Sequence, residues 1–229
     1  VQSGTFGAVL MRDPAQVAAC VDAMQAAVDV PVTVKCRIGV DEQDPHQVLP
    51  EFLARIVAAG CERVTIHARK AWLQGLSPKE NRDIPPLDYP LVQDMKGLFP
   101  HLHISINGGV DSLAQASAHL DGGLDGVMIG RAAYHQPWEI LGGADPVIYG
   151  TPAPASQPED IARAMIPYIA RHIAAGGRLH QVTRHMLGLF HGRPGARQWK
   201  RLLSTRGTAA DAGPEIIEEA LAAMQNALA

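Results

Sequence analysis

Four short β-branched runs alternate with amphipathic helical patterns, and this alternation constrains the fold more than any other feature of the sequence. The runs lie at residues 32–35, 64–67, 104–107 and 127–130, and turn residues bound each of them. Helices are predicted at residues 14–27, 47–59, 91–98 and 112–118, with a short one after Arg131. Alternating strands and helices predict an α/β fold with a parallel sheet.

Each predicted strand is apolar until its last residues, which are polar or very small or are followed by such residues. These residues are Lys35 and Arg37, His67 and Arg69, Asn107 with Gly108 and Gly109, and Gly130 with Arg131. In a βα barrel the carboxyl ends of the strands form the active-site face. A closed barrel needs about eight strands. We therefore expect the carboxyl-terminal half of a TIM (β/α)8 barrel, with the first strands upstream of Val1.

The sequence changes character after Gly143. Residues 145–154 are rich in proline, which is typical of a linker. From Gln157 onward the pattern is helical, and single glycines separate the predicted helices. We predict three or four helices and no strand there. The expected domains are residues 1–145, the second half of the barrel, and residues 146–229, a small all-helical domain.

Charge is distributed unevenly along the chain. The net charge is −3, yet nine Arg or Lys residues and no Asp or Glu lie between Ile161 and Arg206. Such a segment favours a polyanionic partner. The three cysteines have no CxxC spacing, so we expect neither a disulfide framework nor a metal site. No apolar run approaches the roughly 18 residues that span a bilayer, and we expect a cytoplasmic protein with no membrane partner.

Two glycine turns at successive strand ends suggest a phosphate site. Asn107, Gly108 and Gly109 follow one strand, and Gly130 and Arg131 follow the next. Glycines let backbone N–H groups approach phosphate oxygens, and Arg binds phosphate in a bidentate manner. The alternative is that both are simply tight turns, but their succession favours phosphate binding.

Lys35 and His67 are candidates for contact with a cofactor. Lys35 ends an apolar strand and needs an anionic partner, which the N1 and O2 atoms of a reduced flavin would provide. The alternative is a lysine whose stem is buried and whose charge reaches solvent. His67 on the same face either contacts the cofactor or is a core histidine with satisfied hydrogen bonds.

The segment of residues 68–82 is long for a connection between a strand and a helix, and long loops often carry function. Trp72 could stack on a base while Lys79 and Arg82 meet phosphates. A solvated lid without a ligand is the alternative.

Five stretches of the sequence together resemble the dihydrouridine synthase family, in particular its A subfamily. They are Val-Lys-Cys-Arg-Ile-Gly at residues 34–39, Ile-His-Ala-Arg-Lys-Ala-Trp-Leu at 66–73, Gly-Leu-Ser-Pro-Lys-Glu-Asn-Arg at 75–82, Ile-Asn-Gly-Gly at 106–109, and Gly130-Arg131. The resemblance implies FMN contacts from Lys35, His67, Asn107, Gly108, Gly109, Gly130 and Arg131. It implies tRNA contacts from Lys79, Arg82, Arg197 and Lys200. Arg37 and Arg69 are further candidates for a substrate pocket.

The resemblance also implies the reaction. Members of this subfamily reduce uridine to 5,6-dihydrouridine in the D-loop of tRNA, at positions 20 and 20a, with FMN as cofactor and NADPH as reductant. The family's catalytic cysteine is expected in a loop just upstream of Val1, so we expect no catalytic residue within this chain and no activity from the chain as written. We expect a monomer. Two alternatives are a barrel enzyme acting on a phosphorylated metabolite and a non-catalytic tRNA-binding fragment.

Overall fold

A computed structural model describes residues 6–153 and 156–226 of the chain. The chain forms two compact units: Val1–Val110 with Ala114–Ile129, and Asp111–Leu113 with Gly130–Ala229. Apart from Asp111–Leu113, the chain passes from the first unit to the second between Ile129 and Gly130. The domain division at residues 145 and 146 stays a prediction. The chain start at Val1 and the linker residue Pro154 lie outside the described residues.

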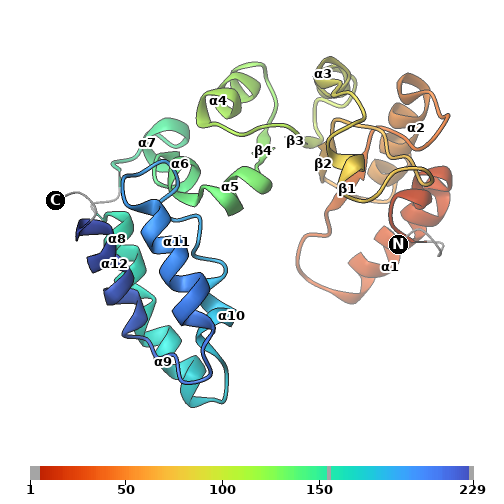
Figure 1. The fold of residues 1–229 in the computed structure, drawn as a ribbon. Coiled ribbons are helices and arrows are strands. Elements are labelled where there is room, and N and C mark those ends of the chain that lie inside the picture. Colours follow the sequence, from red (N-terminus) through yellow and green to blue (C-terminus); the bar gives the residue numbers. More distant parts are fainter. Residues whose placement is uncertain (1–5, 154–155, 227–229) are drawn as a thin grey trace. The chain divides into compact units, whose positions relative to one another are not determined.

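The first unit alternates strands with helices, as predicted. Its strands form one parallel sheet in the chain order β1-β2-β3-β4, which is the order of consecutive βα units in a barrel (Figure 1). Its elements are η1 (Gly7–Arg12), α1 (Pro14–Ala27), β1 (Val34–Arg37), α2 (Pro45–Ala58), β2 (Arg63–His67), η2 (Glu80–Arg82), α3 (Tyr89–Leu98), β3 (His103–Asn107), α4 (Leu113–Asp121) and β4 (Gly126–Met128). The α/β class and the half-barrel sheet are confirmed.

Aspartates begin three of the helices in this unit. The side chain of Asp13 accepts a hydrogen bond from the backbone N–H of Gln16 at the start of α1, and Asp44 and Asp88 cap α2 and α3 in the same way. Each cap satisfies an N–H group that the first helical turn leaves without a partner. The predicted starts of α2 and α3, at residues 47 and 91, were both two residues late because the capping aspartates lie further upstream.

Two strand predictions require correction. The first strand is Val34–Arg37 rather than 32–35, because pairing with β2 begins at Val34 opposite Val64. The fourth strand ends at Met128 rather than at residue 130. Gly130 and Arg131 consequently lie beyond the strand, at the start of α5.

One face of the sheet is apolar and forms the core of the unit. Ile66, Ile104 and Ile106 are fully buried there, and Leu53 and Ile56 of α2 belong to the same cluster. Because side chains alternate between the two faces of a strand, the intervening residues lie on the other face. That second face carries the polar strand-end residues.

The second unit is helical in every described regular element. Its elements are α5 (Arg131–His135), α6 (Pro137–Leu141), α7 (Ala144–Ile148), α8 (Pro158–Ala164), α9 (Ile166–Ala174), α10 (Leu179–Thr183), α11 (Ala196–Thr205), η3 (Arg206–Thr208) and α12 (Ile216–Asn226). Its core is built around the fully buried Trp199 and Phe190. The helical character is confirmed, with five α-helices rather than three or four among described residues after Gln157. Across the described part of the chain, no helix is long and apolar enough to cross a membrane.

Candidate functional site

The register of the sheet gathers polar residues from separate strands on one face. Lys35 lies opposite Thr65, which lies opposite Ser105. Two residues further along, Arg37, His67 and Asn107 form the next row. Both rows have the same parity along their strands, so their side chains project from the same face, at the carboxyl ends of the strands. The predicted residues Lys35, Arg37, His67 and Asn107 are thus brought together on one edge.

Lys35 lies on the exposed side of β1. Partial burial of its ammonium group lowers its pKa, and the nearby charge of Arg37 lowers it further. Both effects disfavour the charged form, and an anion bound beside the ammonium group would offset them. Lys35 has no ion-pair partner among the residues that the structure describes. Contact of Lys35 with an anionic ligand stays a prediction.

The turn after β3 packs closely against neighbouring side chains. Gly108 has φ +106° and Gly109 has φ +73°, values that side-chain-bearing residues rarely adopt. A Cβ atom on Gly108 would lie 2.5 Å from Cδ2 of His67, which is itself buried. A Cβ atom on Gly109 would lie 2.6 Å from Cδ1 of Leu87. Only glycine fits both positions. Gly109 is exposed, so its backbone can be reached at a strand end, as a phosphate site requires.

Asn107 is held by the neighbouring strand. Its side-chain Nδ2 donates to the carbonyl oxygen of Met128 at 2.8 Å. The hydroxyl of Tyr89 donates to the carbonyl oxygen of Gly108 at 2.7 Å. Tyr89 was not among the predicted site residues, although it contacts the centre of the glycine turn.

Arg37 and Arg69 hold the long loop after β2. Nη1 of Arg37 donates to the carbonyls of Lys70 and Asn81, at 3.1 and 2.8 Å. Nη1 of Arg69 donates to the carbonyls of Asp83 and Pro85, while its buried Nε atom has no hydrogen-bond partner among the described residues. Burial lowers the pKa of Arg37, and the charges of Arg69 and Arg82 lower it further. Both side chains position the loop, and a substrate role for them stays a prediction.

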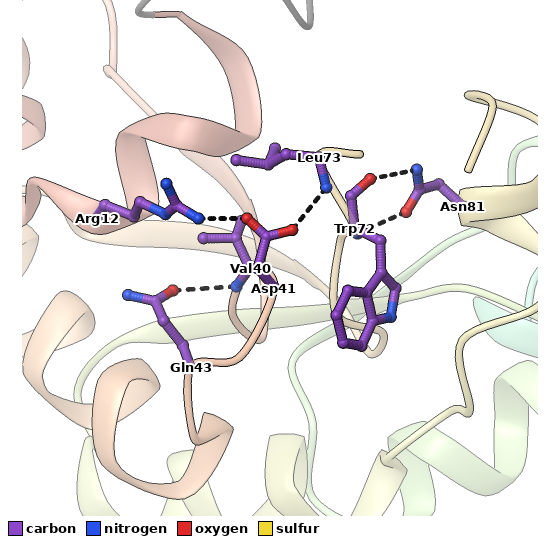
Figure 2. A network of polar contacts seen from close by, with 7 residues as sticks. All are labelled: Arg12, Val40, Asp41, Gln43, Trp72, Leu73 and Asn81. Atoms are coloured by element: carbon purple, nitrogen blue, oxygen red, sulfur yellow. Dashed lines mark hydrogen bonds and ion pairs between the residues drawn. The ribbon is translucent and has the colours of Figure 1, made fainter. Parts of the chain in front are cut away.

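Asn81 and Asp41 fix the same loop at two further points (Figure 2). The buried Asn81 side chain accepts from the N–H of Trp72 and donates to the carbonyl of Trp72, both at 2.7 Å. Asp41 accepts from the N–H of Leu73 at 2.8 Å and forms an ion pair with Arg12. Asp41 has a left-handed backbone with φ +47°, which aspartate tolerates better than most residues. The backbone on both sides of Trp72 is therefore anchored.

The loop carries the residues that are predicted to contact RNA. Trp72 is half-buried, and the ammonium group of Lys70 lies 5.3 Å from the centre of its ring. Lys79 and Arg82 are exposed at the two ends of the short helix η2. Asn81 lies between them and points inward. The exposed charges thus stand on a fixed piece of backbone.

Gly130 and Arg131 belong to the second unit. Gly130 is the residue before α5 and has φ −103°, a conformation open to any residue, and a Cβ atom there would meet nothing within 4 Å. Arg131 is exposed as the first residue of α5. A role for them at a phosphate stays a prediction. At Gly130, unlike Gly108 and Gly109, the surrounding side chains do not require glycine.

The basic segment of the second unit is partly neutralised by carboxylates from outside the segment. Arg163 pairs with Glu218 at 3.1 Å, Arg193 with Glu159 at 3.9 Å, and Arg206 with Glu219. The other cations of the segment are exposed: Arg171, Arg178, Arg184, Arg197, Lys200 and Arg201. Arg197 and Lys200 lie three residues apart on α11 and flank the buried Trp199. Their spacing places them on neighbouring positions of one helix surface.

The cysteines lie away from the polar face of the sheet. Cys36 is buried on the apolar face, and burial raises its pKa to about 12. Burial also raises the pKa of Cys61, whose Sγ donates to the carbonyl of Arg63 at 3.2 Å. Cys20 is exposed on α1. Among the described residues no cluster of three or more His, Cys, Asp or Glu side chains could hold a metal ion.

A parallel half-barrel sheet with basic and amide side chains and a glycine turn at its strand ends is the arrangement of a βα-barrel enzyme. The sequence model of the family described as Dihydrouridine synthase (Dus) matches residues 1–228. The chain belongs to the dihydrouridine synthase family.

Curated relatives are similar over the same region. The tRNA-dihydrouridine(20/20a) synthase of Shewanella oneidensis is 53% identical over 228 residues, which are 100% of this chain and 68% of the relative. The enzyme of the same name from Vibrio cholerae is 54% identical over 97% of this chain and 68% of its own length. That of Escherichia coli K12 is 53% identical over 96% of this chain and 64% of its own length. The chain thus spans about two thirds of these relatives.

Proposed function

We propose that this protein reduces uridine to 5,6-dihydrouridine in the D-loop of tRNA, at positions 20 and 20a, with FMN as cofactor and NADPH as reductant. The observation that carries the proposal is the aligned strand-end face, where Lys35 projects from the same side of the sheet as His67 and Asn107, and where a turn that admits only glycine follows Asn107. The names of the relatives, which are about half identical to this chain, supply the reaction and its nucleotide positions. We propose the cytoplasm as the site of action, since tRNA is the substrate.

The residues of the first unit fit FMN chemically. The exposed backbone of Gly109 suits the terminal phosphate, and the side-chain amide of Asn107 lies two residues before it in the chain. In this proposal Lys35 would contact the N1 and O2 side of the isoalloxazine ring, and His67 would contact the ring or the ribityl chain. Contacts of Gly130 and Arg131 with FMN rest on the family resemblance alone. The chemistry that bound FMN supplies is hydride transfer to C6 of uracil.

The chain's own residues have separate tasks in this proposal. Lys35 holds a positive charge where negative charge develops on reduction, which favours the reduced state. The anchored loop offers Trp72 for stacking on a base, with Lys79 and Arg82 for phosphates, and the target base must leave its stack to be reached. A proton must also reach C5 of uracil. Cys36 faces the core of the sheet, so we do not assign it that task.

Replacing Lys35 by alanine tests the cofactor assignment. In the full-length protein, we expect the flavin midpoint potential to become more negative and the single-turnover rate of tRNA reduction to fall by at least about tenfold, since a positioned charge at the reacting group is removed. The free energy of unfolding should change little because Lys35 is exposed. Lys35→Arg, which keeps the charge, is the matched control and should retain most of the potential. An unchanged potential and rate in Lys35→Ala would show that Lys35 does not face the flavin.

A double replacement of Arg197 and Lys200 by alanine tests the RNA assignment. We expect weaker tRNA binding and a salt dependence whose logarithmic slope falls by about 0.7 for each lost phosphate contact. The control is Arg55→Ala with Arg63→Ala, since both residues are exposed and lie at the end of α2 and the start of β2, away from the strand carboxyl ends. Full affinity with an unaltered slope in the α11 variant would mean that these are solvated surface charges.

A further inference from the structure

Tyr89 links three parts of the first unit that surround the glycine turn. It is the first residue of α3, and the N–H of the preceding Asp88 donates to the carbonyl of Ala68 at 2.8 Å. The N–H of Ala68 in turn donates to the carbonyl of Asn107 at 3.0 Å. The start of α3 is therefore fixed to the ends of both β2 and β3.

The aromatic ring and the hydroxyl of Tyr89 contact different sides of the turn. The ring lies edge-on to His119 of α4, with ring centres 4.6 Å apart. The hydroxyl donates to the carbonyl of Gly108 at 2.7 Å, and a Cβ atom on Gly109 would lie 2.7 Å from the same hydroxyl. Tyr89 thus occupies the space that a side chain at Gly109 would need.

The hydrogen bond from Tyr89 also sets the direction of an amide group. In a planar trans peptide the N–H of one residue points opposite to the carbonyl of the residue before it. With the carbonyl of Gly108 directed at Tyr89, the N–H of Gly109 must point away from Tyr89. Gly109 is exposed, and its N–H makes no hydrogen bond within the described part of the chain.

We propose that Tyr89 is a positioning residue for the flavin phosphate: by holding the carbonyl of Gly108, it directs the N–H of Gly109 toward the phosphate oxygens. This inference rests on the proposed FMN site. It assigns to Tyr89 no contact with the cofactor, only control of the peptide between Gly108 and Gly109. Glycine has wide backbone freedom, so without this hydrogen bond the peptide can rotate.

The test compares FMN with riboflavin, which lacks the phosphate. Dissociation constants of both flavins are measured by fluorescence titration of the flavin-free protein and of its Tyr89→Phe variant, which keeps the ring and loses the hydroxyl. We expect the FMN dissociation constant to rise about three- to tenfold, the range that one net hydrogen bond gives. The riboflavin constant should stay within about twofold, because no phosphate is bound.

Two further variants separate the hydrogen bond from packing. His119→Leu removes the ring contact but keeps the hydroxyl, and should leave the ratio of FMN to riboflavin affinity unchanged. Tyr149→Phe, at a residue that is 72% exposed in the second unit, should change neither affinity. Comparing these variants also shows whether any loss follows from reduced stability, which circular dichroism melting monitors in parallel.

The possible outcomes are distinct. A selective loss of FMN affinity in Tyr89→Phe supports the inference. An equal loss of both flavins, or no loss of either, overturns it while leaving the FMN site intact. If the unmodified protein binds neither flavin, the proposed cofactor fails first, and the role of Tyr89 fails with it.

Discussion

Replacing Trp199 by alanine is expected to lower the free energy of unfolding of the second unit by about 3–5 kcal/mol, the range for removing a large buried aromatic side chain. Trp199 is fully buried at the centre of that unit. Its ring meets Phe190 edge to face at 4.8 Å, and its Nε1 donates to the carbonyl of Met186 at 3.1 Å. Alanine would lose the packing and this hydrogen bond, and would leave a cavity.

Urea denaturation followed by circular dichroism measures this effect. Trp199→Phe keeps most of the packing but has a smaller ring and loses the hydrogen bond to Met186, whose carbonyl still accepts from the N–H of Leu189 at 3.1 Å. An intermediate loss of about 1–3 kcal/mol is therefore expected. Arg197→Ala on the same helix is the surface control and should change stability by no more than about 0.5 kcal/mol. A loss below about 1 kcal/mol for Trp199→Ala would contradict the central position of this side chain.

Alkylation is expected to modify Cys20 rapidly and Cys36 at least about a hundredfold more slowly in the folded protein. Only the thiolate reacts, and a thiol with a pKa of about 12 is ionised to about one part in 10⁴ at pH 8. Cys36 is also buried beneath the helices, whereas Cys20 is exposed. Mass spectrometry of peptides after timed treatment with iodoacetamide at pH 8 gives the three rates separately.

The denatured protein provides the control, since all three cysteines should then react at similar rates. Rapid native labelling of Cys36 would show that the sheet opens or that the thiol lies on the other face. The raised pKa has a second consequence. Because folding raises the Cys36 pKa from 9.0 to about 12, the thiol's stabilising contribution is complete below pH 9 and is lost as the pH rises toward 12.

The ends of β2 and β3 were predicted correctly, whereas those of β1 and β4 were each wrong by two residues. His67 and Asn107 close their strands as the sequence indicated, because the change from β-branched to polar residues coincides with the end of pairing. β1 begins later than expected because pairing with β2 decides its extent, and residues 32 and 33 have no partner there. A hydrophobic pattern in the sequence indicates which residues are buried, but it does not indicate which residues pair with a neighbouring strand.

Asn81 and Tyr89 could not be assigned from sequence for a different reason. Their partners are backbone groups, Trp72 and Gly108, whose positions depend on how the loop and the turn fold. Asn81 lies within a stretch that resembles the family. The sequence, however, indicated a role in RNA binding only for the neighbouring charged residues Lys79 and Arg82. Similarly, charge composition predicted a basic helical segment but not the three ion pairs from Glu159, Glu218 and Glu219.

The anchoring of the loop around Trp72 makes its tip a suitable attachment point for a spectroscopic reporter. Gln74 is exposed, and the space where a side chain of the adjacent Gly75 would stand is empty to 4 Å. Asp41 and Asn81 form hydrogen bonds with the backbone just before this tip. A dye on Gln74→Cys would therefore be attached next to backbone that is held in place. With Cys20→Ser removing the exposed native thiol, labelling would be selective. The emission of such a dye would then follow the approach of RNA with little background from movement of the loop itself.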